Sequence, residues 1–245
     1  MPGGTGDTRE TTLAERAYRV IRDRILRADY PLGAEIRRRE LAVELGMSTV
    51  PINDALARLE SEYLIENIPR VGTRVRIPTP ADIRGFWAVR EGLEAQAARL
   101  FARNAGEPER RELQRAGAEL DRLHESSTNV PQPDPEVLLR WRLEHMAFHL
   151  RIAEGTRIPF LVHAIEKNQI LVFNWFYDHR ISAARALPPH WHENLAKSLS
   201  PGSEADADTA MREHLRNRLE ELLQRLEEHL TLSPEHLATL MQMKK

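Results

Sequence analysis

The sequence predicts a mainly helical protein in two parts: a small N-terminal domain that ends in a β-hairpin, and a larger bundle made only of helices. Apolar residues recur at helical spacing through most of the chain, and strand-type alternation occurs only within 64–77. Prolines cluster directly after that stretch. The expected divisions are a flexible tail at 1–12, the small domain at 13–77, the helical domain at 78–230 and a short tail helix at 231–245.

Composition limits the class of protein. The 245 residues are 41% hydrophobic and 29% charged, as is typical of a globular chain. The absence of cysteine excludes disulfides, thiol catalysis and sulfur-based zinc sites, and it agrees with a reducing compartment. No segment has the pattern of a signal peptide or the roughly 20 apolar residues of a membrane span, so we expect a cytoplasmic protein without membrane contact.

Charge and histidine are unevenly distributed. The net charge is -2, yet residues 13–77 carry 12 arginines against 10 acidic residues, and the remainder is acidic on balance. All ten histidines follow residue 120. A basic segment and a histidine-rich segment indicate two domains with different tasks.

The small domain opens with two helices. The first covers 13–25, with apolar residues on one face and arginines on the other, and Pro31 and Gly33 end the segment. The second covers 38–45, and Gly46 follows it in the position of a left-handed C-cap.

A third helix and a hairpin complete this domain. Ser48 can cap the helix, and Pro51 is tolerated because it falls in the first turn. Residues 64–67 and 73–77 have the pattern of two short strands around a turn that contains Gly72. A helix, a helix-turn-helix and a hairpin in this order predict a winged helix-turn-helix.

Candidate DNA contacts follow, because the N-terminal part of a recognition helix meets base edges in the major groove. Asn53 can pair with adenine, and Thr49 can contact a thymine methyl group. Arginines near the second helix and on the hairpin can reach phosphates. The predicted DNA-binding residues are Arg37, Arg38, Arg39, Ser48, Thr49, Asn53, Arg70 and Arg74. The alternative is that the three adjacent arginines form only a solvated face.

The larger domain follows a stiff segment, 77–80, that contains two prolines. Beyond it the hydrophobic spacing is helical throughout, and Trp87 and Trp141 are expected in the core. The expected helices cover about 81–104, 107–127, 134–154, 157–181, 185–200 and 205–230.

His145 and His149 lie four residues apart on one expected helix, so both imidazoles point to the same side. The spacing suits a metal ion, and imidazole ligands favour zinc, nickel, copper or iron over magnesium or calcium. Such a pair also occurs as ordinary surface or core decoration. Three other histidines are expected to face solvent: His124, His229 and His236.

A dense motif covers 39–42, 45–56, 59–60, 64–65 and the wing glycine Gly72. It resembles, in register, the pattern of the GntR family of bacterial transcription regulators. The resemblance implies a winged helix-turn-helix that binds operator DNA, with Arg39 at a DNA-contacting position. The family usually has arginines where this chain has Thr49 and Asn53, so we expect an operator that is less centred on guanine.

Three further motifs, at 90–98, 145–149 and 192–215, resemble the helical effector domain of FadR-type members of that family. In the metal-binding members one aspartate and three histidines ligate an ion, which implies His149, His192 and His214 as ligands here. His145 stands at the aspartate position, so the predicted site has four histidines and no charged ligand. Such a set favours zinc or nickel over harder ions. The alternative is a site that binds an anionic effector without metal.

The same resemblance implies that Arg90 points into the bundle and binds an effector carboxylate, and Glu94, one turn on, is its candidate partner. An ordinary salt bridge on the helix surface is the alternative.

These features predict a homodimeric regulator that places one recognition helix on each operator half-site. The main hypothesis is a repressor released by a small carboxylate effector, and the second is a regulator for which the metal ion itself is the effector. A metal-dependent enzyme is disfavoured, because no HExxH motif, Ser-His-Asp pattern or paired acid and base accompanies the histidines.

Overall fold

The computed structural model describes residues 12–27, 29–128, 134–176, 187–200 and 203–232. The chain divides into two compact units, Met1–Ile77 and Pro78–Lys245. Nearly all of the expected N-terminal tail lies outside the described residues, as does the expected tail helix apart from its first two residues, which belong to the last helix of the bundle.

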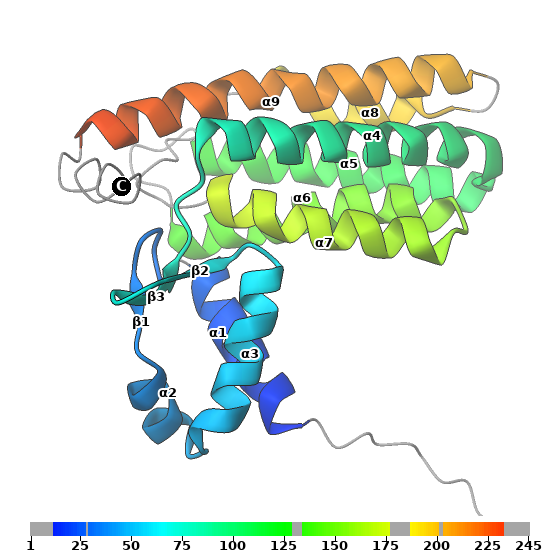
Figure 1. Cartoon of the computed structure of the whole chain (residues 1–245). Coiled ribbons are helices and arrows are strands. Elements are labelled where there is room, and N and C mark those ends of the chain that lie inside the picture. Colours follow the sequence, from blue (N-terminus) through cyan, green and yellow to red (C-terminus); the bar gives the residue numbers. More distant parts are fainter. Residues whose placement is uncertain (1–11, 28, 129–133, 177–186, 201–202, 233–245) are drawn as a thin grey trace, which may run out of the picture. The chain divides into compact units, whose positions relative to one another are not determined.

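The first unit is built on three helices, α1 (Leu13–Leu26), α2 (Arg38–Leu45) and α3 (Thr49–Ser61), which Figure 1 shows in blue to cyan. α1 packs on α3, and their apolar faces form a core in which Ile21, Ile52 and Leu59 are fully buried. Gly46 ends α2 with a φ of 64°, which confirms the expected left-handed C-cap.

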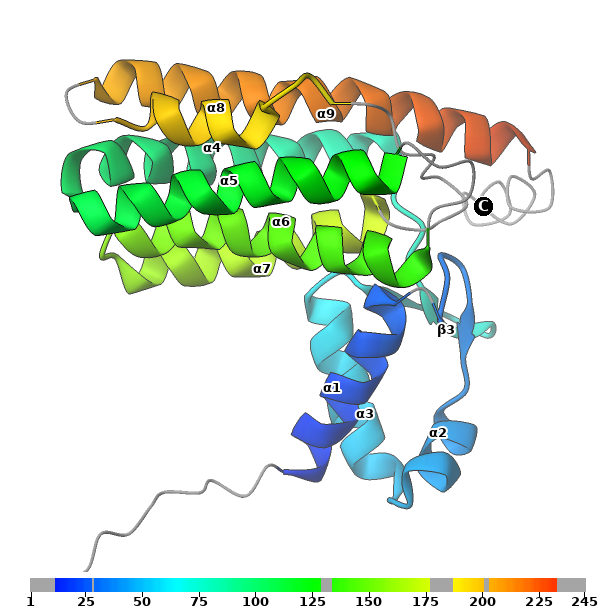
Figure 2. The same cartoon turned by 180° about the vertical axis from the view of Figure 1, so that it is seen from behind.

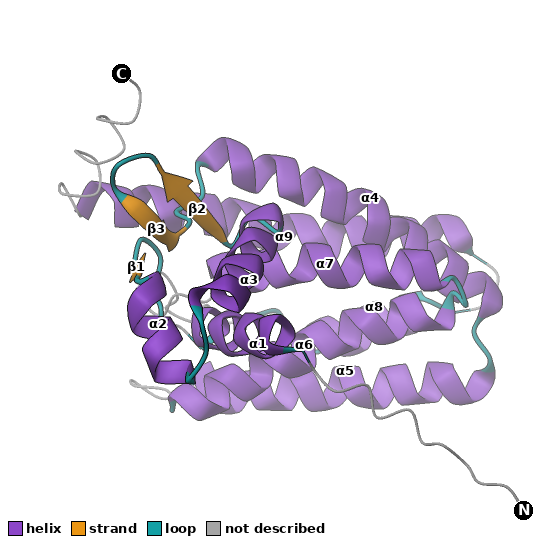
Figure 3. Ribbon diagram, turned by 60° about the horizontal axis from the view of Figure 1, so that its bottom comes forward, coloured by secondary structure: helices purple, strands orange, loops and turns teal. Residues whose placement is uncertain are grey.

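A small antiparallel sheet completes the first unit. It contains β1 (Glu35–Ile36), β2 (Ile65–Ile68) and β3 (Gly72–Val75) in the order β1-β3-β2 (Figure 3). β2 and β3 form the expected hairpin, and their register pairs Asn67 with Thr73. β1 was not expected, because two residues are too short to show an alternating pattern.

In the second unit, all regular secondary structure of the described residues is helical. Its helices are α4 (Pro80–Asn104), α5 (Glu107–Thr128), α6 (Pro135–Gly155), α7 (Pro159–Phe176), α8 (Trp191–Ser198) and α9 (Glu204–Leu232). α4 runs along α9 and α6 along α7, and the view from behind shows α8 against α5 (Figure 2). None of the described helices has an apolar stretch long enough to cross a bilayer.

Local signals fix the start of α4, where Thr79 and Asp82 form a capping box. Trp87 and Trp141 are buried as expected, and Trp87 Nε1 donates a hydrogen bond to the carbonyl oxygen of Leu215 at 3.1 Å. The sequence pattern extended α8 too far, since the described helix covers only Trp191–Ser198. Pro188 and Pro189 precede it, and neither continues a helix.

Candidate DNA interface and candidate metal centre

α3 presents two chemically different faces. Its apolar face, which includes Ile52 and Leu56, is buried against α1, whereas Thr49, Val50 and Asn53 are exposed. Ser48 stands at the N-cap with extended backbone, but its side chain makes no capping hydrogen bond, contrary to the expectation from sequence. The exposed residues lie in the first turns of α3, as in a helix that enters the major groove N-terminus first.

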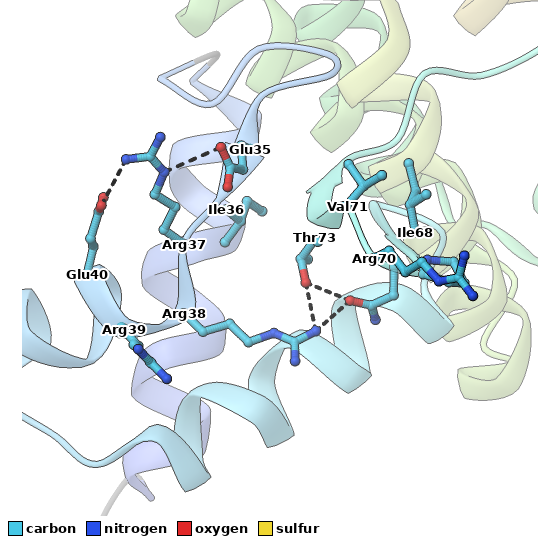
Figure 4. Close-up of a pocket in the computed structure, with 13 residues that line it drawn as sticks. Glu35, Ile36, Arg37, Arg38, Arg39, Glu40, Ile68, Arg70, Val71 and Thr73 are labelled. Atoms are coloured by element: carbon cyan, nitrogen blue, oxygen red, sulfur yellow. Dashed lines mark hydrogen bonds and ion pairs between the residues drawn. The ribbon is translucent and has the colours of Figure 1, made fainter. Parts of the chain in front are cut away.

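A groove of about 720 Å³ lies between the start of α2 and the hairpin (Figure 4). The three adjacent arginines and the hairpin turn line it, together with Glu35 and Glu40. Arg70 adopts a left-handed φ of 67° in that turn and is exposed. A groove with this lining offers several cations to a polyanion such as a phosphate backbone.

The arginines of the groove are not equivalent. Arg37 is 60% exposed and pairs with Glu35 at 3.3 Å and Glu40 at 3.0 Å. Arg38 instead reaches the hairpin, where its Nη2 donates hydrogen bonds to Asn67 Oδ1 at 2.6 Å and Thr73 Oγ1 at 2.8 Å. Arg38 therefore already connects α2 to the hairpin within the protein itself.

Two further arginines of the predicted set differ just as sharply. Arg39 is exposed and forms no ion pair within the described part of the chain. Arg74 is 8% exposed, and its Nε donates to Glu66 Oε1 at 2.7 Å across the hairpin. Arg39 thus exposes its guanidinium to solvent, whereas that of Arg74 is held against Glu66.

Four histidines from three helices of the second unit converge. The ligand nitrogens of His145 (α6), His192 (α8) and His214 (α9) lie within 4.8 Å of one another. His149, one turn after His145, joins them: its Nε2 lies 3.2 Å from His145 Nε2, and its ring centroid lies 5.2 Å from that of His214. The structure thus brings together all four histidines predicted as metal ligands.

The donor set suits a divalent transition ion chemically, and one pair of its nitrogens has the separation that such an ion requires. Two nitrogens at about 2.05 Å from one tetrahedral ion lie about 3.3 Å apart, close to the 3.2 Å between His145 and His149. His149, His192 and His214 are buried, so the cluster is shielded from bulk water. The nitrogens are soft enough for zinc, nickel or copper, and the cluster itself contains no carboxylate that would favour a harder ion.

Carboxylates stand behind two of these imidazoles. Glu94 Oε2 lies 2.5 Å from His149 Nδ1, and Asp121 Oδ1 lies 2.6 Å from His192 Nδ1. A carboxylate on Nδ1 fixes the tautomer and orientation of a histidine and leaves Nε2 for a metal. The spacing of the histidines predicted neither role, because Asp121 is 71 positions from His192 and Glu94 was expected only as the partner of Arg90.

Burial and charge set the protonation of the site. Burial lowers the pKa of His145 well below its usual value, and the neighbouring His149 and His192 lower it further. Burial alone would raise the pKa of Glu94 and of Asp121. Arg90 and His149 outweigh that effect at Glu94, as His192 does at Asp121, and both pKa values are lowered. The result is a neutral imidazole at His145 with ionised carboxylates behind its neighbours, as metal ligation requires.

Arg90 is buried, with 5% of its surface exposed, so it is not a surface salt bridge. Its Nε donates to Glu94 Oε1 at 2.7 Å, and its guanidinium lies over the ring of Trp87. Among the described residues no hydrogen bond to its terminal nitrogens is present. These nitrogens are the part of Arg90 that could bind an added anion.

His124 corrects a prediction from the sequence. It was expected to face solvent, but it is 5% exposed and its ring centroid lies 5.0 Å from that of Trp141. Trp141 in turn stacks on His145. The helical periodicity of α5 did not reveal this, because α5 is covered on two sides, by α6 and α8. The side chains of His229 and His236 lie outside the described residues.

Comparison with known proteins identifies the family. Residues 13–75 match the bacterial regulatory proteins of the gntR family, and residues 86–217 match the FCD domain. The chain belongs to the gntR family. It carries a gntR-type winged helix-turn-helix, the DNA-binding domain of these regulators, followed by an FCD domain.

Relatives of this gntR-family regulator include named repressors. The HTH-type transcriptional repressor GlaR of Escherichia coli K12 is 23% identical over 203 residues, which cover 81% of the chain and 90% of GlaR. A repressor assigned to a D-xylose utilization operon of Paenarthrobacter nicotinovorans is 37% identical over 94 residues, or 38% of the chain and 42% of that protein. An HTH-type regulator of Agrobacterium vitis is 36% identical over 86 residues, 50% of its length. The chain thus spans about half or less of these last two relatives.

Solved structures share the fold. McbR/YncC of E. coli aligns with a TM-score of 0.69 at 20% identity and covers 88% of the chain and 99% of its own. A GntR regulator of Rhodococcus sp. RHA1 aligns with a TM-score of 0.66 at 18% identity and covers 86% of the chain and 97% of its own. At these identities the likeness supports the architecture of the regulator and leaves its ligands to be inferred from its own residues.

Proposed function

We propose that this gntR-family regulator is a cytoplasmic, homodimeric repressor whose operator affinity depends on a ligand bound at the histidine cluster. The observation that carries the proposal is the convergence of four histidines in the domain that follows the DNA-binding domain along the chain: His145, His149, His192 and His214. The four imidazoles are buried or half-buried, and carboxylates orient two of them. DNA binding by the winged helix-turn-helix does not require such a cluster, so the cluster serves a different ligand.

In the first unit, Thr49 and Asn53 contact base edges, and Ser48 binds a phosphate at the start of α3. Arg37, Arg39 and Arg70 reach phosphates from the groove and the hairpin. Arg38 and Arg74, whose guanidinium groups are held by protein partners, contribute mainly by positioning the hairpin. Two copies of the chain, one on each half-site, read a pseudo-palindromic operator.

In the second unit, the four histidines hold a divalent transition metal, with zinc or nickel favoured by the neutral nitrogen donors. If its coordination expands beyond the four imidazoles, the bound ion would supply a Lewis acid that anchors an anionic group. Arg90 lies beside the site and offers its terminal nitrogens to the same anion, so a small carboxylate is the effector class that fits best. Effector binding shifts the dimer between arrangements of different operator affinity.

The test combines metal analysis with DNA binding. An operator duplex is selected from random sequences, and its affinity is measured by fluorescence anisotropy for protein as purified, stripped with chelator and reloaded with zinc or nickel. One ion per chain, lost in the variant His214→Ala together with the response to carboxylates, supports the proposal. Protein that retains no stoichiometric metal in any form overturns the metal site.

The same assay separates the second candidate, a metal sensor, in which the ion is itself the effector. In that case removal of the ion alone changes operator affinity, and added carboxylates do not change it further. Arg90 favours the carboxylate effector, because its terminal nitrogens have no hydrogen-bond partner among the described residues although its Nε is paired with Glu94.

A further inference from the structure

α8 lies unusually close to α5 at one point. A Cβ on Gly117 of α5 would lie 2.8 Å from the carbonyl oxygen of His192 and 3.0 Å from the backbone nitrogen of Glu193. Real side chains essentially never approach backbone this closely, so only glycine permits the contact. The backbone that rests on Gly117 is the first turn of α8, which carries the metal-ligand candidate His192.

One turn further along α5, Asp121 binds the same turn of α8. Its carboxylate accepts hydrogen bonds from the backbone nitrogens of His192 at 3.1 Å and Glu193 at 3.0 Å, and it also lies 2.6 Å from His192 Nδ1. α8 has no cap of its own, since its N-cap residue His190 has a φ of 56° and makes no side-chain capping bond. Asp121 therefore caps α8 from a neighbouring helix.

We propose that Gly117 and Asp121 form a seat for α8 in which one carboxylate both caps the helix and orients His192, so that metal affinity and docking of α8 on α5 are coupled. Asp121 is in this sense a positioning residue. The inference rests on the proposed metal site, and it adds that the site is complete only when α8 is seated.

The coupling follows from the shared acceptor. A metal on Nε2 of His192 makes its Nδ1–H a stronger donor, which strengthens the bond to Asp121 and with it the capped first turn. Conversely, a displaced α8 moves Nε2 away from His145 and His214, and metal–nitrogen distances tolerate only about 0.2 Å of change. By thermodynamic linkage, metal binding favours docking of α8 on α5 by the same free energy by which docking favours metal binding.

The experiment uses the full chain and four proteins: wild type, Gly117→Ala, Asp121→Asn and the control Gly92→Ala. Gly92 lies in α4, and an added Cβ there meets nothing within 4 Å. Cobalt and zinc affinities are measured by competition with a chromophoric chelator, and the cobalt d–d spectrum reports ligand geometry. Hydrogen exchange of residues 191–198 is followed with and without zinc.

We expect Asp121→Asn to weaken metal binding by about ten- to a hundredfold, the usual effect of losing a carboxylate behind a ligating histidine. Gly117→Ala should weaken binding by at least about tenfold although it changes no polar group, and both variants should exchange faster in α8 without metal. Gly92→Ala should stay within about twofold of wild type. In wild type, zinc should slow exchange in α8.

Three results overturn the coupling. The first is that Asp121→Asn and Gly117→Ala both bind metal within about twofold of wild type. The second is that zinc leaves hydrogen exchange in α8 of the wild type unchanged. If Gly117→Ala does not fold, Asp121→Asn alone decides. A wild-type protein that binds no cobalt or zinc overturns the proposed metal site as well, so the two failures are distinguishable.

Discussion

Arg38 Nη2 donates a hydrogen bond to Thr73 Oγ1 at 2.8 Å, and this bond joins the start of α2 to β3. Thr73 is 3% exposed, and its hydroxyl in turn donates to Asn67 Oδ1 at 2.6 Å. The backbone nitrogen of Asn67 donates to Glu60 near the end of α3 at 3.2 Å, and its side-chain amide binds the same carboxylate. One network therefore connects α2, the hairpin and the recognition helix, and Figure 4 shows the part of it that joins Arg38 to Thr73.

The variant Thr73→Val tests whether this network holds the hairpin in place for DNA. Valine has a similar shape but lacks the hydroxyl, which accepts from Arg38 and donates to Asn67. We therefore expect operator binding to weaken about five- to thirtyfold, which corresponds to one or two hydrogen bonds of about 1 kcal/mol each. The slope of log K against log salt should not change, because no phosphate contact is lost. Anisotropy titrations at several salt concentrations measure both quantities.

Arg39→Gln is the matched control, because Arg39 is exposed and proposed to bind phosphate directly. It should weaken binding and also reduce the magnitude of the salt slope by about 0.9. A reduced slope in Thr73→Val, or unchanged affinity in that variant, would show that the network does not position the hairpin.

The reading face of α3 predicts an operator with few essential guanines. Thr49 and Asn53 are exposed at its start, and neither supplies the bidentate arginine contact that guanine favours. Replacing each operator base in turn should therefore cost most at adenine and thymine positions, about 1–3 kcal/mol each. Asn53→Arg should shift the selected operators toward guanine. The largest losses at guanines facing Thr49 or Asn53 in the wild type would contradict this.

Periodicity and caps predicted most of the fold, because each depends on residues close in sequence. Gly46 ended α2 where expected, and the His145–His149 pair was visible as one face of a helix. The roles of Asp121 and Glu94 were not predictable in this way. Each depends on two helices meeting in space, and local spacing carries no information about which carboxylate will lie behind which imidazole. The partners of Arg38, Asn67 and Thr73, were not predictable for the same reason.

His145 in place of an aspartate makes a prediction about metal choice. The variant His145→Asp adds a hard, charged oxygen ligand to His149, His192 and His214, so we expect manganese or iron to compete better against zinc than in wild type. Equal mixtures of ions, followed by desalting and elemental analysis, measure the preference. His145→Ala is the control, since it removes a nitrogen without adding an oxygen. Identical metal content in wild type and His145→Asp would exclude His145 from the ligand set.

The contribution of His145 to the stability of the metal-free second unit should fall as the pH drops below about 6.5. Burial lowers the folded-state pKa of His145 below the unfolded value, so the unfolded chain binds a proton that the folded bundle does not. The contribution of His145 to the free energy of unfolding is therefore smallest in acid. It should decrease by about 1 kcal/mol between pH 7 and pH 5.5. The lowered pKa values of Glu94 and Asp121 act in the same direction, but only below about pH 4.5, where the unfolded carboxylates become protonated.

Urea unfolding in chelator measures this, because all four tryptophans follow residue 80 and their fluorescence reports the second unit alone. The variant His145→Gln keeps a polar side chain that does not titrate, so its loss of stability between pH 7 and pH 5.5 should be smaller than that of wild type by about 1 kcal/mol. His163→Gln is the matched control, since His163 is exposed and should leave the wild-type pH dependence unchanged. Equal pH dependence in wild type and His145→Gln would show that the folded cluster accepts a proton on His145 as readily as the unfolded chain does.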